Sequence, residues 1–178
     1  MRVVAGNLGG RKLIGPPKRS REVRPTSDRT RETLFALLDQ NMPISGVRVL
    51  DLFSGTGALA IEAISRGADS AVLVDTAPAI AQRNVDALGI ANRCKIVRSD
   101  AIRYLERTNE RFGLVLGDPP YKLAPRLEPL LAQHLPPHLA KYARVAFESS
   151  ARRPLEIDLP LQAERRVGEA LIRIWSER

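Results

Sequence analysis

The sequence predicts an α/β fold in which a mostly parallel sheet is covered by helices. Strand-like and helix-like segments alternate from Val47 to Glu148, and alternation at this short spacing is typical of a parallel sheet wrapped by helices. The chain has 178 residues, the length of one domain, and 44% of them are hydrophobic, which is enough for a buried core. Two further β-like runs, residues 154–159 and 169–175, could pair as an antiparallel edge and bring the sheet to seven strands.

The first 40 residues are expected to form an extension to this sheet. β-Branched residues flank a Gly- and Asn-rich turn between Arg2 and Ile14, which is typical of a β-hairpin. Residues 15–17, Gly-Pro-Pro, break regular structure, and we expect an extended loop from there to Pro25. Any of Thr26, Ser27 and Asp28 can cap the helix that follows, which runs to Leu38 and joins the extension to the body.

The body follows the alternation element by element. Its strand-like segments are rich in Val, Leu and Ile, as in strands that are buried on both faces. The predicted strands are residues 47–52, 70–74, 95–98, 113–117 and 144–148. The predicted helices are residues 57–66, 78–88 and 101–107, followed by a Leu- and Pro-rich helical stretch at 125–139. We therefore divide the chain into an extension, residues 1–40, and a ligand-binding body, residues 41–178.

Positive charge is concentrated at the N-terminus. Residues 1–31 contain nine Arg and Lys and two acidic residues, a net charge of +7, whereas the whole chain has +8. A near-neutral body with a basic leader indicates a polyanionic partner such as a phosphate backbone, although a solubilising arm is the alternative. The candidate nucleic-acid contacts are Arg11, Lys12, Lys18, Arg19, Arg21, Arg24, Arg29 and Arg31.

Composition argues against several other classes of protein. No window holds the ~18 uninterrupted apolar residues of a membrane span, and the N-terminus lacks the apolar run of a signal peptide, so we expect a cytoplasmic protein. Cys94 is the single cysteine, and His134 and His138 are the two histidines. We therefore expect neither a disulfide framework nor a bound metal.

Small and acidic residues follow the first three predicted strands. Ligands of open α/β sheets bind outside the carboxyl ends of the strands, so these residues are the first candidates for a binding site. The candidates for cofactor binding are Asp51, Phe53, Ser54, Gly55, Thr56, Gly57, Asp75, Thr76, Asp100 and Ala101.

These strand ends suit a cationic cofactor. Gly55-x-Gly57 with Asp75 also fits a dinucleotide fingerprint, but Asp51 would repel a pyrophosphate. S-adenosylmethionine has a sulfonium and an ammonium group, which Asp51 could hold directly or through water. Asp75 could then accept the ribose hydroxyls, and Asp100 the adenine amino group. Each acid alone could instead be a helix cap or turn former, and this alternative fits Asp100 best because it precedes a helix.

The fourth strand is followed by Asp118-Pro119-Pro120-Tyr121. Paired prolines fix the backbone and remove two N–H donors, which leaves the Asp118 side chain and the Pro119 carbonyl as acceptors. Two acceptors suit an NH₂ group, and Tyr121 offers a flat face on which a planar base or amide can stack. The alternative is a rigid turn with an incidental aromatic residue.

The motifs at residues 51–57 and 118–121 resemble those of class I methyltransferases that act on exocyclic nitrogens, a group that includes adenine-N6, guanine-N2 and glutamine-N5 enzymes. A narrower resemblance is to the RsmD family, which methylates N2 of a guanine in bacterial 16S rRNA, and it runs from residue 2 to about residue 176. Its motifs are Gly9–Leu13, Arg24–Phe35, Gly57–Ala63 and Phe147–Ser149.

The resemblance implies a Rossmann-like class I methyltransferase sheet with an N-terminal β-hairpin extension. It also implies S-adenosylmethionine as cofactor and a whole or partly assembled small ribosomal subunit as partner. The reaction would be an in-line methyl transfer to an unstacked guanine, with Asp118, Pro119, Pro120 and Tyr121 as the catalytic residues. We expect a monomer without metal.

Three alternatives stay open at this point. An adenine-N6 methyltransferase acting on DNA or RNA would use the same strand-end residues. A non-catalytic ribosome-assembly factor would bind RNA on the sheet, but Asp51, Asp75 and Asp118 would repel phosphate there. A glutamine-N5 protein methyltransferase has little use for a basic leader. The sequence does not identify the modified nucleotide or the role of residues 122–141 in base recognition.

Overall fold

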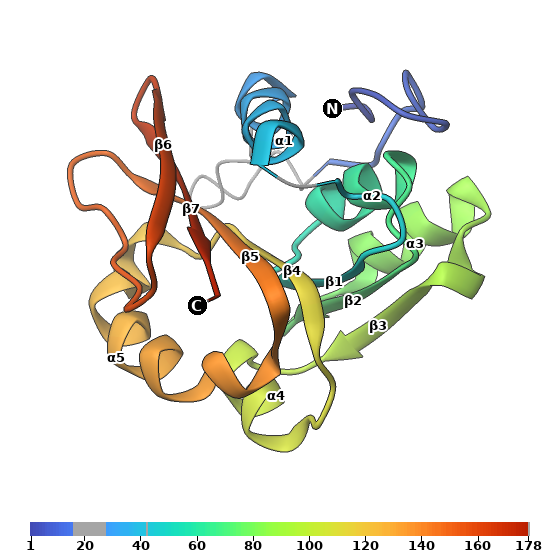
Figure 1. Ribbon diagram of the computed structural model, residues 1–178. Helices are drawn as coiled ribbons and strands as arrows, with labels where there is room; N and C mark the ends of the chain where they lie inside the picture. The colour runs from blue at the N-terminus through green and yellow to red at the C-terminus, as the bar shows by residue number, and fades with distance from the viewer. Residues whose placement is uncertain (16–27, 42, 178) are drawn as a thin grey trace.

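A computed structural model describes residues 1–15, 28–41 and 43–177 of the protein. A seven-stranded sheet runs through it in the order β3-β2-β1-β4-β5-β7-β6 (Figure 1). The strands are β1 (Arg48–Leu52), β2 (Ser70–Asp75), β3 (Cys94–Arg98), β4 (Phe112–Gly117), β5 (Leu139–Ser150), β6 (Leu161–Val167) and β7 (Ala170–Ser176). The first five are parallel, and β7 lies antiparallel between β5 and β6. The predicted α/β fold with seven strands is confirmed.

The strand order reverses between β1 and β4. The chain goes outward from β1 to β2 and β3, and then returns to place β4 on the other side of β1. At such a switch point the connections leave in opposite directions, which opens a crevice at the carboxyl ends of the two strands. The topology therefore places the candidate site at the ends of β1 and β4.

Helices cover both faces of the sheet. They are α1 (Asp28–Asn41), α2 (Ala58–Ser65), α3 (Ala79–Leu88), α4 (Ala101–Arg107) and α5 (Ala124–His134), with 3₁₀ turns η1 (Ala91–Arg93), η2 (Tyr121–Leu123) and η3 (Pro136–His138). Val49 on β1 belongs to the core cluster that includes residues of α1, α2 and α3, whereas Leu50 belongs to the cluster that includes residues of α4 and α5. Figure 1 shows α1 and α2 on one side of the sheet and α4 and α5 on the other. No helix in the described ranges is both long and apolar enough to cross a membrane.

The antiparallel pairing at the edge of the sheet was predicted correctly, but one of its two strands was assigned to the wrong residues. β7 pairs with β6 at residues 161–167, whereas residues 154–159, all of them described, form no strand. Leu155 and Ile157 are buried in the core cluster that contains α4 and α5, and this burial explains their alternating apolar pattern. β6 is an edge strand with mostly exposed polar side chains, so its hydrophobic signal is weak.

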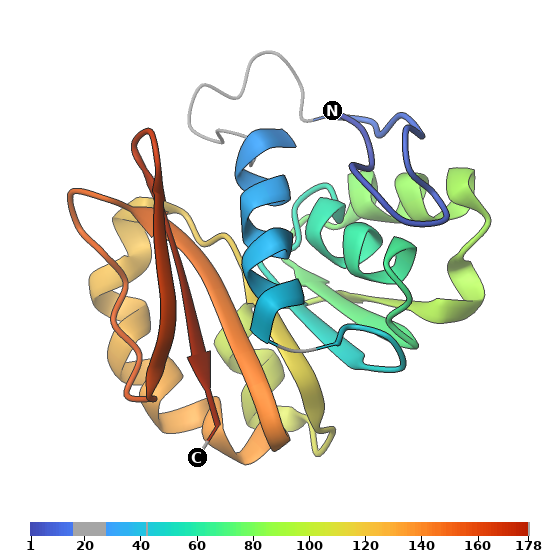
Figure 2. The ribbon, with the colours of Figure 1, turned by 45° about the horizontal axis from the view of Figure 1, so that its top comes forward.

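The predicted N-terminal hairpin is confirmed as a chain reversal but not as a pair of strands. The amide of Val3 donates to the carbonyl of Arg11 at 2.9 Å, and Arg2 and Lys12 form a single isolated bridge. The segment lies against α2 (Figure 2), and a Cβ on Gly6 would lie 1.9 Å from the carbonyl oxygen of Ser65. The turn is therefore packed on the body rather than extended from it. The helix caps predicted at Thr26 and Ser27 lie outside the described residues.

Candidate active site

A tight turn after β1 forms the floor of the site. The amide of Ser54 donates to the carbonyl of Val74 at 3.0 Å, and the amide of Gly57 donates to the carbonyl of Ser54 at 2.6 Å. Phe53 and Gly55 both have positive φ, 65° and 52°. Gly57 has φ 78°, and a Cβ there would lie 2.9 Å from Cδ2 of Leu73, so a side chain at this position would be strained and crowded. The turn holds its backbone against β2 because glycine permits this approach.

The Asp75 carboxylate at the end of β2 is oriented by the same turn. Its Oδ2 accepts from the amide of Gly55 at 2.8 Å, and its Oδ1 accepts from the amide of Ala77 at 2.8 Å. Each carboxylate oxygen can accept a second hydrogen bond. Asp75 is half-buried, so it can present both oxygens to a vicinal diol while its orientation is fixed.

Asp51 is a buried acid within β1, with an exposed fraction of 1%. Its Oδ2 accepts from the amide of Ala60 in α2 at 3.0 Å, and its Oδ1 has no hydrogen-bond partner among the described residues. The pKa of Asp51 is raised to about 8: burial is the largest cause, the Ala60 amide acts against it, and the negative charges of Asp75 and Asp118 add to the rise. A nearby cation would favour the ionised form, so this carboxyl group fits a positively charged ligand.

Asp100 caps α4. Its Oδ1 accepts from the amides of Ile102 and Arg103 at 2.9 and 3.1 Å, and Ala101 is the buried first residue of the helix. The helix-cap alternative therefore describes what Asp100 does in this structure, and its contact with an adenine stays a prediction. Thr76 is exposed after β2, and its carbonyl accepts from Nε of Arg98 at 3.3 Å.

The second half of the site lies at the ends of β4 and β5. Asp118 is half-buried, Pro119 is buried, Pro120 is exposed, and Tyr121 opens the 3₁₀ turn with 37% of its surface exposed. The Tyr121 hydroxyl donates to Oε1 of Glu148 at 3.1 Å, and Glu148 is buried near the end of β5. The backbone here is also crowded, since a Cβ on Gly117 would lie 2.5 Å from the Phe147 ring.

The structure brings three of the predicted acids to one edge of the sheet. Leu52, at the end of β1, pairs with Val74 on β2 and with Gly117 on β4, so the chain segments with Asp75 and Asp118 flank β1 at the same level. The site thus combines a buried acid, an oriented carboxylate and a carboxylate followed by two prolines. Sequence reasoning gave no role to Glu148, although a carboxylate near the end of a buried strand beside β4 is the kind of signal that could have found it.

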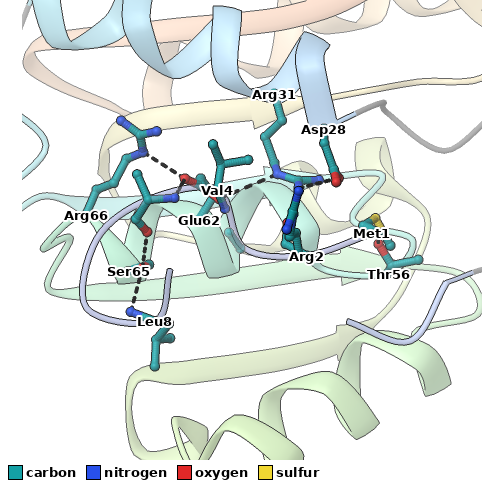
Figure 3. A network of polar contacts seen from close by, with 12 residues as sticks. Met1, Arg2, Val4, Leu8, Asp28, Arg31, Thr56, Glu62, Ser65 and Arg66 are labelled. Carbon is teal, nitrogen blue, oxygen red and sulfur yellow. Dashed lines mark hydrogen bonds and ion pairs between the residues drawn. The ribbon is translucent and has the colours of Figure 1, made fainter. Parts of the chain in front are cut away.

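The N-terminal segment is fastened to the body by a buried carboxylate on α2, Glu62 (Figure 3). The amides of Val4 and Ala5 donate to its two oxygens at 2.7 and 3.0 Å, and Nε of Arg66 donates at 2.9 Å. Nε of Arg31 lies 3.6 Å from the same carboxylate. The predicted RNA contact at Arg31 is therefore wrong, because its side chain is fully buried in this network and cannot reach a phosphate.

Asn84 joins the N-terminal segment to the glycine turn. Its Oδ1 accepts from the amide of Ile14 at 2.7 Å, and its Nδ2 donates to the carbonyls of Ile14 and Thr56 at 3.1 and 2.9 Å. The Asn84 side chain is itself buried on α3. The leader and the floor of the site therefore share one side chain.

The other predicted nucleic-acid contacts divide into two groups. Arg11, Lys12 and Arg29 are exposed. Lys18, Arg19, Arg21 and Arg24 lie outside the described residues. Within the described ranges, no three His, Cys, Asp or Glu side chains are grouped so that they could hold a metal ion.

Comparison with known proteins gives concordant matches. Ribosomal RNA small subunit methyltransferase D of Escherichia coli K12 is 37% identical over 124 residues, which are 68% of this chain and 61%, less than two thirds, of that protein. YlbH of Bacillus subtilis is 36% identical over 128 residues, 68% of this chain and 67% of YlbH. The solved structure of Escherichia coli yhhF superposes with a TM-score of 0.81 at 32% identity and covers 100% of this chain and 98% of that chain.

A family model, described as conserved hypothetical protein 95, matches residues 1–176. The match includes the leader as well as the strand-end motifs, in agreement with the resemblance drawn from both parts of the sequence. The chain therefore belongs to the conserved hypothetical protein 95 family, the family of the RsmD proteins.

Proposed function

We propose that this protein transfers a methyl group from S-adenosylmethionine to the exocyclic N2 of a guanine in small-subunit ribosomal RNA. The proposal rests mainly on three acidic residues that lie together beside a glycine turn. They are Asp51, Asp75 and Asp118, at the carboxyl ends of β1, β2 and β4. The name of the Escherichia coli relative supports ribosomal RNA of the small subunit as the substrate. Since that substrate is cytoplasmic, we place the protein in the cytoplasm. We also infer that it acts as a monomer.

The residues fit S-adenosylmethionine better than a dinucleotide. The buried Oδ1 of Asp51 lacks a hydrogen-bond partner among the described residues. A cationic ligand would interact with this atom and lower the pKa of the carboxyl group, so that it loses its proton. Asp75 is held in place by two amides and can accept from both ribose hydroxyls. A pyrophosphate would instead meet negative charge at this edge. When bound, S-adenosylmethionine supplies an electrophilic methyl group on a positively charged sulfur.

Asp118, Pro119 and Tyr121 would prepare the acceptor. The amino nitrogen of guanine is a poor nucleophile because its lone pair is delocalised into the ring. Hydrogen bonds from this NH₂ group to the Asp118 carboxylate and the Pro119 carbonyl would favour a pyramidal nitrogen, while the exposed ring of Tyr121 holds the base in plane. Asp118 is also suited to take the proton that the nitrogen releases on methylation.

The basic leader would engage the phosphate backbone. Arg11 and Lys12 are exposed on the N-terminal turn, and Glu62 and Asn84 fasten that turn to the body. A basic turn that is fixed relative to the site can hold the RNA while the target base enters the site, and unstacking that base is easiest in a loop of the RNA. The division into a basic extension, residues 1–40, and a body, residues 41–178, is part of this proposal.

Methyl transfer from labelled S-adenosylmethionine tests the proposal. The acceptors are small ribosomal subunits from a strain that lacks the gene, naked 16S rRNA and duplex DNA, and the products are identified by mass spectrometry of nucleosides. We expect N2-methylguanosine from one of the ribosomal acceptors and at least 10²-fold less with Asp118→Ala. N6-methyladenine would favour the adenine-specific alternative, and RNA binding without any transfer would favour the assembly factor.

A further inference from the structure

Glu148 is a buried carboxylate beside the proposed acceptor site that the mechanism above does not use. Gly117 on β4 pairs with Phe147 on β5, so Asp118 and Glu148 follow them at the same level on neighbouring strands. Glu148 is 5% exposed, and its Oε1 accepts a hydrogen bond from the Tyr121 hydroxyl at 3.1 Å. Glu148 is therefore in contact with the residue on which the base would stack.

Burying a carboxylate is unfavourable unless hydrogen-bond donors surround it. The Tyr121 hydroxyl is one such donor to Glu148. A base that stacks on Tyr121 would bring its own N–H donors to the same carboxylate. This contact also fixes the Oε1 atom in direction, which is what recognition of one edge of a base requires.

Guanine and adenine differ on the edge that such a carboxylate would meet. Guanine presents an N1–H donor next to its amino group, whereas adenine presents an N1 lone pair next to its amino group. A carboxylate that faces N1 is attracted by the first base and repelled by the second. An enzyme that reads a flipped base in this way discriminates through its Watson–Crick edge.

We propose that Glu148 accepts a hydrogen bond from N1–H of the target base and thereby selects guanine over adenine. This inference rests on the proposed function, in which Asp118 and Pro119 hold the neighbouring amino group. Tyr121 then has two tasks, since its ring stacks on the base and its hydroxyl orients Glu148. Glu148 is a specificity residue in this scheme, and the methyl transfer itself depends on Asp118.

The test uses base analogues that keep the amino group but lack N1–H. The modified nucleotide is first mapped with wild-type protein, and 16S rRNA is then ligated around an oligonucleotide that carries guanine, 2-aminopurine or 2,6-diaminopurine at that position. We expect wild-type protein to methylate guanine about 10- to 100-fold faster, in kcat/KM, than either analogue. This arm needs no variant, so it stands even if substitution of the buried Glu148 prevents folding.

Glu148→Gln keeps an acceptor for the Tyr121 hydroxyl and replaces the charge with an amide that can donate to the N1 lone pair of the analogues. We expect it to lose activity on guanine and to bring the guanine-to-analogue ratio close to one, with S-adenosylmethionine affinity unchanged. Glu106→Gln is the matched control, because Glu106 is an exposed residue near the far end of α4. Tyr121→Phe, which keeps the ring and removes the hydroxyl, should lower the ratio to an intermediate value.

Two outcomes separate this inference from the function on which it rests. If wild-type protein methylates none of the ribosomal acceptors, the proposed function fails and takes the inference with it. If it methylates guanine N2 and treats guanine and the analogues alike, or if Glu148→Gln folds and keeps the wild-type ratio, the function stands and Glu148 does not read the base.

Discussion

At the scale of single residues, Asp51 shows how burial changes the chemistry of a carboxyl group. Burial raises its pKa from an ordinary 3.8 to about 8, so the folded protein binds this proton more tightly than the unfolded chain does. The free energy of unfolding must therefore fall as the pH rises from about 4 to about 8. At about 1.4 kcal/mol per unit of pKa, the decrease is on the order of 5 kcal/mol over this range.

Asp51→Asn should abolish this pH dependence. The amide oxygen of the new side chain can still accept from the Ala60 amide, while no charge is buried above pH 8. We expect the variant to melt at a higher temperature than wild type at pH 9 and at a similar temperature at pH 5, as followed by circular dichroism. The control is Asp158→Asn at an exposed position. Parallel melting profiles for wild type and Asp51→Asn would show that Asp51 is ionised throughout this range.

The same group should link cofactor binding to proton release. At pH 7 Asp51 is mostly protonated, and a sulfonium or ammonium near it favours the carboxylate, so binding should release a proton. We expect the release to approach one proton for S-adenosylmethionine and to be smaller for S-adenosylhomocysteine, which lacks the positive sulfur. Calorimetry in buffers of different ionisation enthalpy measures it. Equal proton release by wild type and Asp51→Asn would contradict this assignment.

At the scale of elements, α2 links the N-terminal segment to the sheet. Its Glu62 is fully buried and accepts from Val4, Ala5 and Arg66, with the buried Arg31 close by. Removing one partner of a buried ion pair leaves the other charge uncompensated. This carboxylate therefore holds the N-terminal segment on the body together with Asn84, which binds Ile14.

Glu62→Ala should destabilise the protein by about 3–5 kcal/mol, because the Val4 and Ala5 amides would lose their acceptor and the buried Arg31 would keep only its ion pair with Asp28. Chemical denaturation measures the destabilisation, and hydrogen exchange should report earlier exposure of the Val4 and Ala5 amides than of the sheet. Glu32→Ala, at an exposed position of α1, serves as the control and should change stability by less than about 0.5 kcal/mol. A similarly small effect for Glu62→Ala would mean that the segment is held by other interactions.

Elements whose buried apolar residues form a regular pattern in the sequence could be predicted. Features that depend on contacts between residues far apart in the sequence could not. The central strand at residues 48–52 is a continuous apolar run because it is covered on both faces. The strand at residues 161–167 escaped prediction because an edge strand needs little apolar surface. Asp51, Asp75 and Asp118 were found from their places at the ends of strands, whereas Glu62 and Arg31 are partners only through packing of α1 on α2.

At the scale of the whole molecule, opposite charges are separated between the leader and the site. The carboxylates Asp75 and Asp118 flank the end of β1, whereas Arg11 and Lys12 are exposed on the N-terminal turn. Phosphates are therefore attracted to the leader and repelled from the strand ends, so a base can approach the site more easily than the backbone that carries it. Asn84 connects the two regions through Ile14 and Thr56.

Removing charge from the leader should weaken RNA binding and leave cofactor binding unchanged. We expect Arg11→Gln with Lys12→Gln to lower the affinity for small-subunit RNA and to reduce the slope of log affinity against log salt by about 0.7–0.9 for each phosphate that the leader no longer binds. Substitution is preferable to deletion, because a truncated chain would strip Glu62 of its amide partners.

Lys141→Gln, at an exposed position near the start of β5 and so at the opposite edge of the sheet, should change neither affinity nor slope. Filter binding over a range of salt concentrations, with calorimetry of S-adenosylmethionine alongside, makes the comparison. If the double substitution and Lys141→Gln give the same slope as wild type, these two residues of the leader do not bind phosphate, and the RNA must be held elsewhere.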